Sequence, residues 1–199
     1  MTRVTIKTER LLLSRFQVQD APDLARYRQH PDVARYQSWE SYSLEEANDL
    51  IATMIKASPW SLDTWFQFAL RQQPSQKLIG DIGFRRHTRG PSYEAEIGYS
   101  LDPLFQKQGY MREALQALID WAQKQLLIRR FSASIDPRNT DSARLLTALG
   151  FERQARFQKS IWFKGAWADD DVYVWMPEMA ERKGLSHEGK VEKEGQARP

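Results

Sequence analysis

The sequence predicts a mixed α+β fold, with a mostly antiparallel central sheet flanked by helices. Hydrophobic periodicity gives the order strand, two helices, three strands, helix, strand, helix and two strands. Helices interleaved with such a run of strands favour mixed layers over a doubly wound parallel sheet. The chain is organised around residues 93–121, which combine a strand, a turn and a helix.

Composition bounds the class of protein. The chain has 199 residues with 41% hydrophobic and 12% aromatic residues, as expected of a globular protein. It contains no cysteine, which excludes disulfides, thiolate nucleophiles and cysteine-based zinc sites. No apolar run approaches about 20 residues, and residues 1–7 do not read as a signal peptide. We therefore expect a cytoplasmic protein with no membrane partner.

The first half of the chain begins with a strand over residues 9–16. Asp20 is expected to cap a short helix, because Pro22 fits its first turn. Ser43 and Glu46 have the spacing of a capping box, which predicts a second helix after them.

A hairpin is expected next. Residues 65–70 and 78–84 read as strands, and Gln73-Pro74-Ser75 between them reads as a turn. The basic run Arg85-Arg86-His87 with Arg89 is expected in a following loop.

Residues 93–121 carry the strongest functional signal in the chain. A strand over 93–101 ends at Asp102-Pro103, and helical periodicity starts near Gly109. A helix start offers free N–H donors and the positive end of the helix dipole, and glycine there lets an anion approach. We therefore predict a phosphate-binding site over residues 106–112.

The second half is predicted as a strand over 130–135, a helix capped by Asn139 and stopped by Gly150, and two strands from Phe151 on. Asp169-Asp170-Asp171 is interpreted as a turn into an edge strand rather than a cation site. Residues 1–180 are expected to form one domain. Residues 181–199, charged and poor in apolar groups, are expected to be a flexible tail.

Four stretches, in this order and spacing, resemble the GNAT acyltransferases, and within them the RimJ/RimL-like ribosomal-protein N-acetyltransferase group. The resemblance covers about residues 6–176. The stretches are Thr8-Glu9-Arg10-Leu11-Leu12-Leu13; Glu96 to Leu101 with Gln106 to Glu113; Asn139 to Leu146 with Leu149-Gly150-Phe151; and Gly165-Ala166-Trp167-Ala168-Asp169 with Tyr173.

The resemblance implies the GNAT fold, splayed between the fourth and fifth strands, and acetyl-CoA as co-substrate without a metal. It places the pyrophosphate on main-chain N–H groups at the predicted anion site, and the pantetheine arm along the end of the fourth strand. Met111 departs from the family pattern, which prefers glycine or alanine there. The implied cofactor-binding residues are Tyr99, Ser100, Leu101, Gln108, Gly109, Tyr110, Met111, Arg112 and Asn139.

Transfer to an amine needs a base for the amine and a proton for the leaving thiolate. The resemblance points to Glu96 as the base, with Glu94 on the same strand face in reserve. Many GNAT enzymes use a tyrosine as acid at the position of Leu146, so that role is absent. The RimJ/RimL-like pattern has a serine instead, which makes Ser142 the candidate proton donor.

Structural explanations compete with these roles. Gly109 also suits a simple turn, Asn139 and Ser142 are common at helix starts, and Glu94 with Glu96 fits a solvated strand face. The seven tryptophans are interpreted as mostly core, and a place in a substrate cleft stays open for Trp39 and Trp60.

The expected function is acetylation of a primary amine, foremost the N-terminal α-amine of a protein. A small-molecule acceptor (amino acid, polyamine or aminoglycoside) and a non-catalytic acyl-CoA-binding protein stay open, as does a homodimer. A net charge of +3 and the lack of nucleic-acid-binding motifs argue against a nucleic-acid module.

Overall fold

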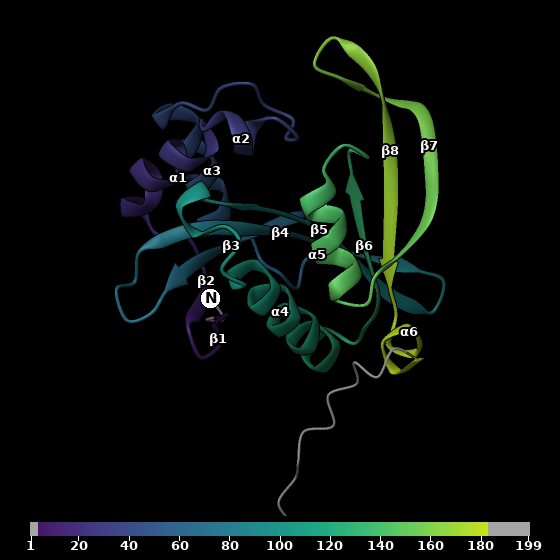
Figure 1. Ribbon diagram of the computed structural model, residues 1–199. Helices are drawn as coiled ribbons and strands as arrows, with labels where there is room; N and C mark the ends of the chain where they lie inside the picture. The colour runs from purple at the N-terminus through teal and green to yellow at the C-terminus, as the bar shows by residue number, and fades with distance from the viewer. Residues whose placement is uncertain (1–3, 183–199) are drawn as a thin grey trace, which may run out of the picture.

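The computed structural model describes residues 4–182 and contains one eight-stranded sheet with the order β1-β2-β3-β4-β5-β6-β8-β7 (Figure 1). Neighbouring strands are antiparallel except β5 and β6, which are parallel. The predicted α+β class is confirmed. The strands are β1 (Ile6–Lys7), β2 (Leu11–Ser14), β3 (Trp65–Gln72), β4 (Leu78–Arg89), β5 (Ser92–Leu101), β6 (Ile128–Ile135), β7 (Glu152–Phe163) and β8 (Ala166–Trp175).

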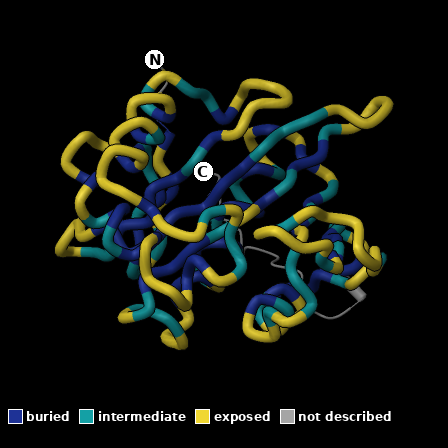
Figure 2. Tube along the Cα trace, turned by 90° about the horizontal axis from the view of Figure 1, so that it is seen from above, coloured by how far each residue is buried: buried dark blue, intermediate teal, exposed yellow. Residues whose placement is uncertain are grey.

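Helices cover both faces of the sheet. On one face, α4 (Tyr110–Leu126) and α5 (Thr140–Ala148) pack in one apolar cluster with strand residues such as Ile97 and Phe131. On the other, α1 (Ala21–Arg28) and α3 (Leu44–Lys56) form a second cluster with Ala69 and Leu78. Figure 2 shows that buried residues concentrate along the central strands. The shorter elements are α2 (Pro31–Ala34), α6 (Pro177–Arg182) and 3-10 turns at Val18–Asp20 and Pro103–Phe105.

Several local signals act as the sequence indicates. Ser43 and Glu46 form the reciprocal capping box at the start of α3. The Asn139 side chain accepts from the Ser142 N–H at the start of α5, and Gly150 follows the end of α5 with φ of +92°. These short-range signals fix where the two helices begin or end.

Asp20 does not cap α1, contrary to expectation. Its side chain makes no capping bond to α1, although it accepts from the Gln17 N–H (2.7 Å) in the preceding 3-10 turn. The carboxylate instead accepts from the buried Arg71 guanidinium on β3, at 2.8 Å (Nη1–Oδ1) and 2.5 Å (Nη2–Oδ2). Because a buried guanidinium needs a charge partner, this long-range pair takes precedence over the cap.

Two charged runs that were expected in loops or turns lie inside strands. The Arg85–Arg89 run continues β4, which pairs with β5 as far as Arg89 and Ser92. Residues 169–171 lie within β8, which has β6 on one side and β7, the edge strand, on the other. Opposite charges across the strands stabilise both runs, as the Arg156–Asp171 pair shows with its 2.6 Å Nε–Oδ1 contact.

The sheet opens between β5 and β6. Their parallel pairing ends at Glu96 and Ser132, although β5 continues to Leu101 and β6 to Ile135. The predicted splay between the fourth and fifth strands is therefore confirmed, since β5 and β6 are those two strands. Figure 1 also shows the long β7–β8 hairpin reaching beyond the other strands.

The ends of the chain complete the description. Helix α6 extends to Arg182, while the rest of the expected tail, residues 183–199, lies outside the described residues. None of the helices within residues 4–182 has the length and apolar character needed to cross a bilayer.

Candidate active site

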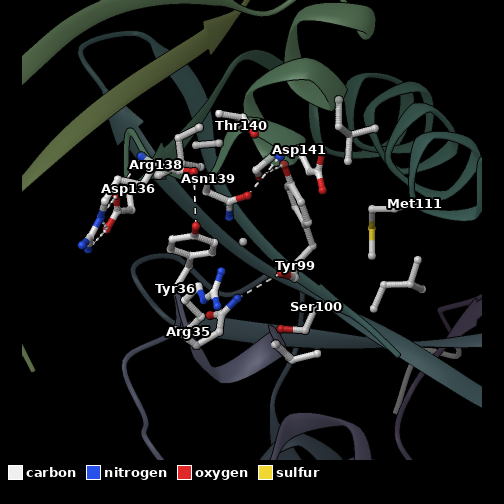
Figure 3. Close-up of a pocket in the computed structure, with 18 of the residues that line it drawn as sticks. Arg35, Tyr36, Tyr99, Ser100, Met111, Asp136, Arg138, Asn139, Thr140 and Asp141 are labelled. Atoms are coloured by element: carbon white, nitrogen blue, oxygen red, sulfur yellow. Dashed lines mark hydrogen bonds and ion pairs between the residues drawn. The ribbon is translucent and has the colours of Figure 1, made fainter. Parts of the chain in front are cut away.

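A cleft of about 850 Å³ lies where β5 and β6 separate. Figure 3 shows side chains from several segments converging there: Tyr36 from the segment after α2, Tyr99 and Ser100 from β5, Met111 from α4 and Asn139 at the start of α5. Two contacts hold α2 and the segment after it against the other side of the cleft, one to the segment before α5 and one to the turn between β7 and β8. The Tyr36 hydroxyl donates to the Arg138 carbonyl (3.2 Å), and Lys164 Nζ donates to the Ala34 carbonyl (2.8 Å).

The start of α4 forms one end of the cleft. Gly109 precedes the helix with φ of +80°, and the first helical bond runs from the Glu113 N–H to the Gly109 carbonyl (3.0 Å). The N–H groups of residues 110–112 therefore have no acceptor within the helix. The Met111 side chain lines the cleft next to this helix start and is buried against the apolar core.

A polar clamp holds this helix start against the turn between β1 and β2. Glu113 accepts from the Thr8 hydroxyl (2.6 Å) and from Arg10 Nε (2.7 Å), and Arg10 Nη1 donates to the Gln108 carbonyl (3.0 Å). Burial alone would raise the pKa of Glu113, but these hydrogen bonds and the Arg10 charge outweigh it and lower the pKa. The Thr8-Glu9-Arg10 motif thus has a physical role, which is to fix the loop ahead of α4.

The free edge of β5 forms the floor of the cleft. Beyond Glu96, β5 no longer pairs with β6, so its main chain can accept another partner. The Gln37 side-chain amide donates to the Tyr99 carbonyl (3.2 Å) and occupies one such position. Tyr99, Ser100 and Leu101 all line the cleft, as the predicted pantetheine pairing requires.

Ser142 lies in the same cleft, one turn into α5. Its Oγ is 2.5 Å from the Tyr99 hydroxyl, which connects α5 to β5 across the separated strands. Burial raises the pKa of Tyr99 far above its ordinary value, although the hydrogen bond with Ser142 lowers it in part. The Tyr99 phenol is therefore protonated at neutral pH and can share a proton with Ser142.

The two glutamates on β5 lie apart from the Ser142 and Tyr99 hydroxyls. Alternation along the strand directs Glu94 and Glu96 to the face of α1 and α3, opposite to Tyr99. The Glu96 carboxylate pairs with the Arg85 guanidinium, and Glu96 is not among the described residues that line the cleft. Glu94 is buried, and its Oε2 lies 2.8 Å from Arg130 Nη1 and 3.5 Å from His87 Nε2.

The sequence does not predict two polar groups that line the cleft, the Tyr99 hydroxyl and the Asp170 carboxylate. The resemblance assigns a role only to the Tyr99 main chain, whereas strand alternation places its side chain on the face of Ile97, α4 and α5. Asp170 is predicted as part of a turn, but it lies within β8 and lines the cleft. Trp39 and Trp60 are not among the described residues that line this cleft. Trp39 is half-buried and its indole donates to the Arg28 carbonyl, whereas Trp60 is 36% exposed and so does not belong to the core.

Comparisons with known proteins agree with this geometry. The acetyltransferase (GNAT) domain model matches residues 10–152. The uncharacterized N-acetyltransferase p20 of Bacillus licheniformis is 30% identical over 172 residues, which cover 86% of this chain and 94% of that protein. A solved ribosomal-protein-S5-alanine acetyltransferase from Vibrio fischeri is 28% identical with a TM-score of 0.74, over 87% of this chain and 96% of that one. RimL, a ribosomal L7/L12 α-N-protein acetyltransferase solved with coenzyme A, is 22% identical and shares the fold, with a TM-score of 0.75 over 87% of this chain and 98% of that one.

Proposed function

Because the chain belongs to the GNAT acetyltransferase family and is therefore an acyltransferase, we propose that it transfers an acetyl group from acetyl-CoA directly to a primary amine in a ternary complex. One observation carries this proposal. The open helix start at Gly109 and the Ser142–Tyr99 hydroxyl pair line the same cleft, on either side of the splayed strands. A cleft with an anion-binding helix start and a pair of hydroxyl groups suits a ligand that carries both a pyrophosphate and a reactive thioester.

The cofactor contacts follow from the geometry of the cleft. The N–H groups of residues 108–112 bind the pyrophosphate, helped by the dipole of α4. The pantetheine amides pair with the main chain of residues 99–101 and displace the Gln37 amide from the Tyr99 carbonyl. Asn139 holds the start of α5 and contacts the pantetheine arm.

The leaving group sets the role of Ser142. When the carbon–sulfur bond breaks, the thiolate needs a proton, and the Ser142 hydroxyl donates it. The Tyr99 hydroxyl is hydrogen-bonded to Ser142, so it orients that hydroxyl. A carboxylate on the opposite face of the splayed sheet takes the proton from the amine, and Glu96 is the residue that the sequence indicates for this role.

Replacing Ser142 with alanine is expected to lower kcat by about 100-fold, the lower end of the range for a lost general acid. The Kd for acetyl-CoA is expected to change by less than about twofold, because the pyrophosphate contacts remain. The rate of thiol release measures kcat, and calorimetric titration with acetyl-CoA measures the Kd. Ser61→Ala, which alters an exposed serine outside the cleft, is the matched control and should match the wild type. An unchanged kcat for Ser142→Ala would remove Ser142 from the mechanism.

For the acceptor, we propose the N-terminal α-amine of a protein, which would place the reaction in the cytoplasm. The support is the Vibrio fischeri S5-alanine acetyltransferase, similar along nearly its whole length. A screen of thiol release with acetyl-CoA tests this against peptides with N-terminal alanine or serine, polyamines, amino acids and aminoglycosides. We expect the peptides to give the highest kcat/KM. A higher value for one of the small molecules would reassign the acceptor, and no turnover with any amine would contradict the proposed function.

A further inference from the structure

The proposed function places the base for the amine on the face of the sheet that carries Glu96, opposite to the Ser142–Tyr99 pair. On this face α1 and α3 cover Ala69 and Leu78 of β3 and β4, whereas Ser134 of β6 and Asp170 of β8 line the open cleft. Strand register places both of these side chains on that face, because Ser134 pairs with Val172 and Asp170 lies two residues from Val172. Ser134 also lies two residues beyond Ser132, where the pairing of β5 with β6 ends. These two groups therefore line the acceptor side of the splay.

Asp170 is a buried carboxylate without a cation partner among the described residues. Its exposed fraction is 8%, and its oxygens accept from the Ser134 hydroxyl, with Oγ 2.5 Å from Oδ1. A buried carboxylate normally needs a positive charge to offset the lost hydration. The Asp170 carboxylate thus has an unmet demand for a cation, and it faces the cleft.

Unlike Asp170, the neighbouring carboxylates have a cation partner or are exposed to solvent. Arg85 pairs with Glu96, Arg130 with Glu94, Arg138 with Asp136, and Arg156 with Asp171. Asp169, the remaining carboxylate of the run, is exposed and accepts from the Lys159 N–H (3.0 Å). Their negative charges are already neutralised or solvated, so a cationic acceptor gains most from contact with Asp170.

We infer that Asp170, oriented by Ser134, binds the ammonium group of the acceptor and takes its proton before acetyl transfer. This inference rests on the proposed function and assigns the base within the same cleft. It gives the role that the sequence indicates for Glu96 to a carboxylate on β8.

The proton balance is complete without another reactant. The ammonium gives one proton to the Asp170 carboxylate, and the freed lone pair forms the bond to the thioester carbonyl carbon. The carbon–sulfur bond breaks, and the thiolate takes a proton from Ser142. The second proton lost by the nitrogen restores the Ser142 hydroxyl, and Asp170 releases its proton to water through the open cleft. The products are the amide, the free thiol of CoA and one proton.

The electrostatics of Asp170 make its carboxylate a better proton acceptor than an ordinary aspartate. Burial raises its pKa, the Ser134 hydrogen bond lowers it in part, and the charges of Asp171, Glu96 and Asp136 raise it further. Arg35 and Arg138 are cations that line the same cleft. A carboxylate with a raised pKa is a stronger proton acceptor than an ordinary one once it is ionised.

The raised pKa also predicts a stability effect. Since the folded state holds the Asp170 proton more tightly than the unfolded state, the group favours folding at acid pH, and this contribution is lost as the pH rises through the folded pKa. We therefore expect Asp170→Asn to melt at or above the wild-type temperature at pH 7. A merely structural role would predict a lower melting temperature instead.

The test compares Asp170→Asn, Glu96→Gln and the wild type with acetyl-CoA and a peptide that begins with alanine. For Asp170→Asn we expect kcat/KM to fall about 100-fold at pH 7, with unchanged acetyl-CoA affinity. Part of the loss should be recovered at pH 9, where an α-amine of pKa about 8 is mostly free. Asp49→Asn removes one exposed carboxylate on α3 that is not among the described residues lining the cleft, and should match the wild type at both pH values.

Each other outcome is decisive. Wild-type rates for Asp170→Asn together with a large loss for Glu96→Gln would overturn the inference while leaving the proposed function intact. No turnover by the wild type with any amine would overturn both. Should Asp170→Asn fail to fold, Ser134→Ala keeps the carboxylate and removes its donor. The acidic limb of its kcat/KM profile is then expected at higher pH, and an unmoved limb would contradict the role of Asp170.

Discussion

Replacing Gly109 with glutamate is expected to abolish acetyl-CoA binding. Gly109 has φ of +80°, a conformation that costs a residue with a side chain about 1–2 kcal/mol. The new carboxylate would also stand at the N-terminus of α4, where the pyrophosphate is proposed to bind. Repulsion between these anions, together with the lost approach of the phosphate to the main chain, should raise the Kd by more than about 100-fold.

Gly90→Glu is the matched control for this variant. Gly90 has φ of +57° between β4 and β5, and a Cβ there would meet no atom within 4 Å. The substitution imposes the same kind of backbone strain and the same added charge away from the helix start. Calorimetric titration should give wild-type affinity for Gly90→Glu and no detectable heat for Gly109→Glu. Unchanged affinity for Gly109→Glu would refute the phosphate site at α4.

Replacing Asp81 with alanine is expected to lower the free energy of unfolding by about 3–5 kcal/mol, the usual cost of breaking a buried ion pair. Asp81 is 2% exposed and accepts from the Tyr27 hydroxyl (2.5 Å) and from Arg28 Nη2 (2.6 Å). Without it the buried Arg28 guanidinium keeps only neutral partners, such as the Tyr42 hydroxyl. The charge would then be uncompensated in the interior.

Urea unfolding followed by tryptophan fluorescence measures this loss. Asp49→Ala, on the exposed side of α3, is the control and should change the free energy of unfolding by less than about 0.5 kcal/mol. The Arg28 carbonyl also accepts from the Trp39 indole (2.9 Å), so the pair helps to hold the segment after α2. A loss below about 1 kcal/mol for Asp81→Ala would show that this network contributes little to stability.

The sequence predicts the parts of the fold that depend on neighbours in the chain. The helix start at Gly109, the Asn139 cap and the Ser43 capping box are all decided within a few residues, and all are present. Asp20 shows the limit of such reasoning. Its choice between capping α1 and pairing with Arg71 depends on a residue 51 positions away, which no local pattern reveals.

The same limit applies to the candidate site. The sequence identifies the residues around the cleft, because a resemblance carries them, and the structure brings Tyr99, Ser142 and Gly109 to one cleft. The sequence does not reveal which of the carboxylates lacks a cation partner. That difference between Glu96 and Asp170 arises from cross-strand partners, Arg85 for one and Ser134 for the other.

The most direct test of the proposed activity is the stoichiometry of the products with acetyl-CoA and a peptide that begins with alanine. Mass spectrometry measures the acetylated peptide while a thiol reagent measures free CoA in the same sample. We expect one acetyl group on the peptide amine for each thiol released. Thiol release without acetylated peptide, or tight acetyl-CoA binding without either product, would contradict it.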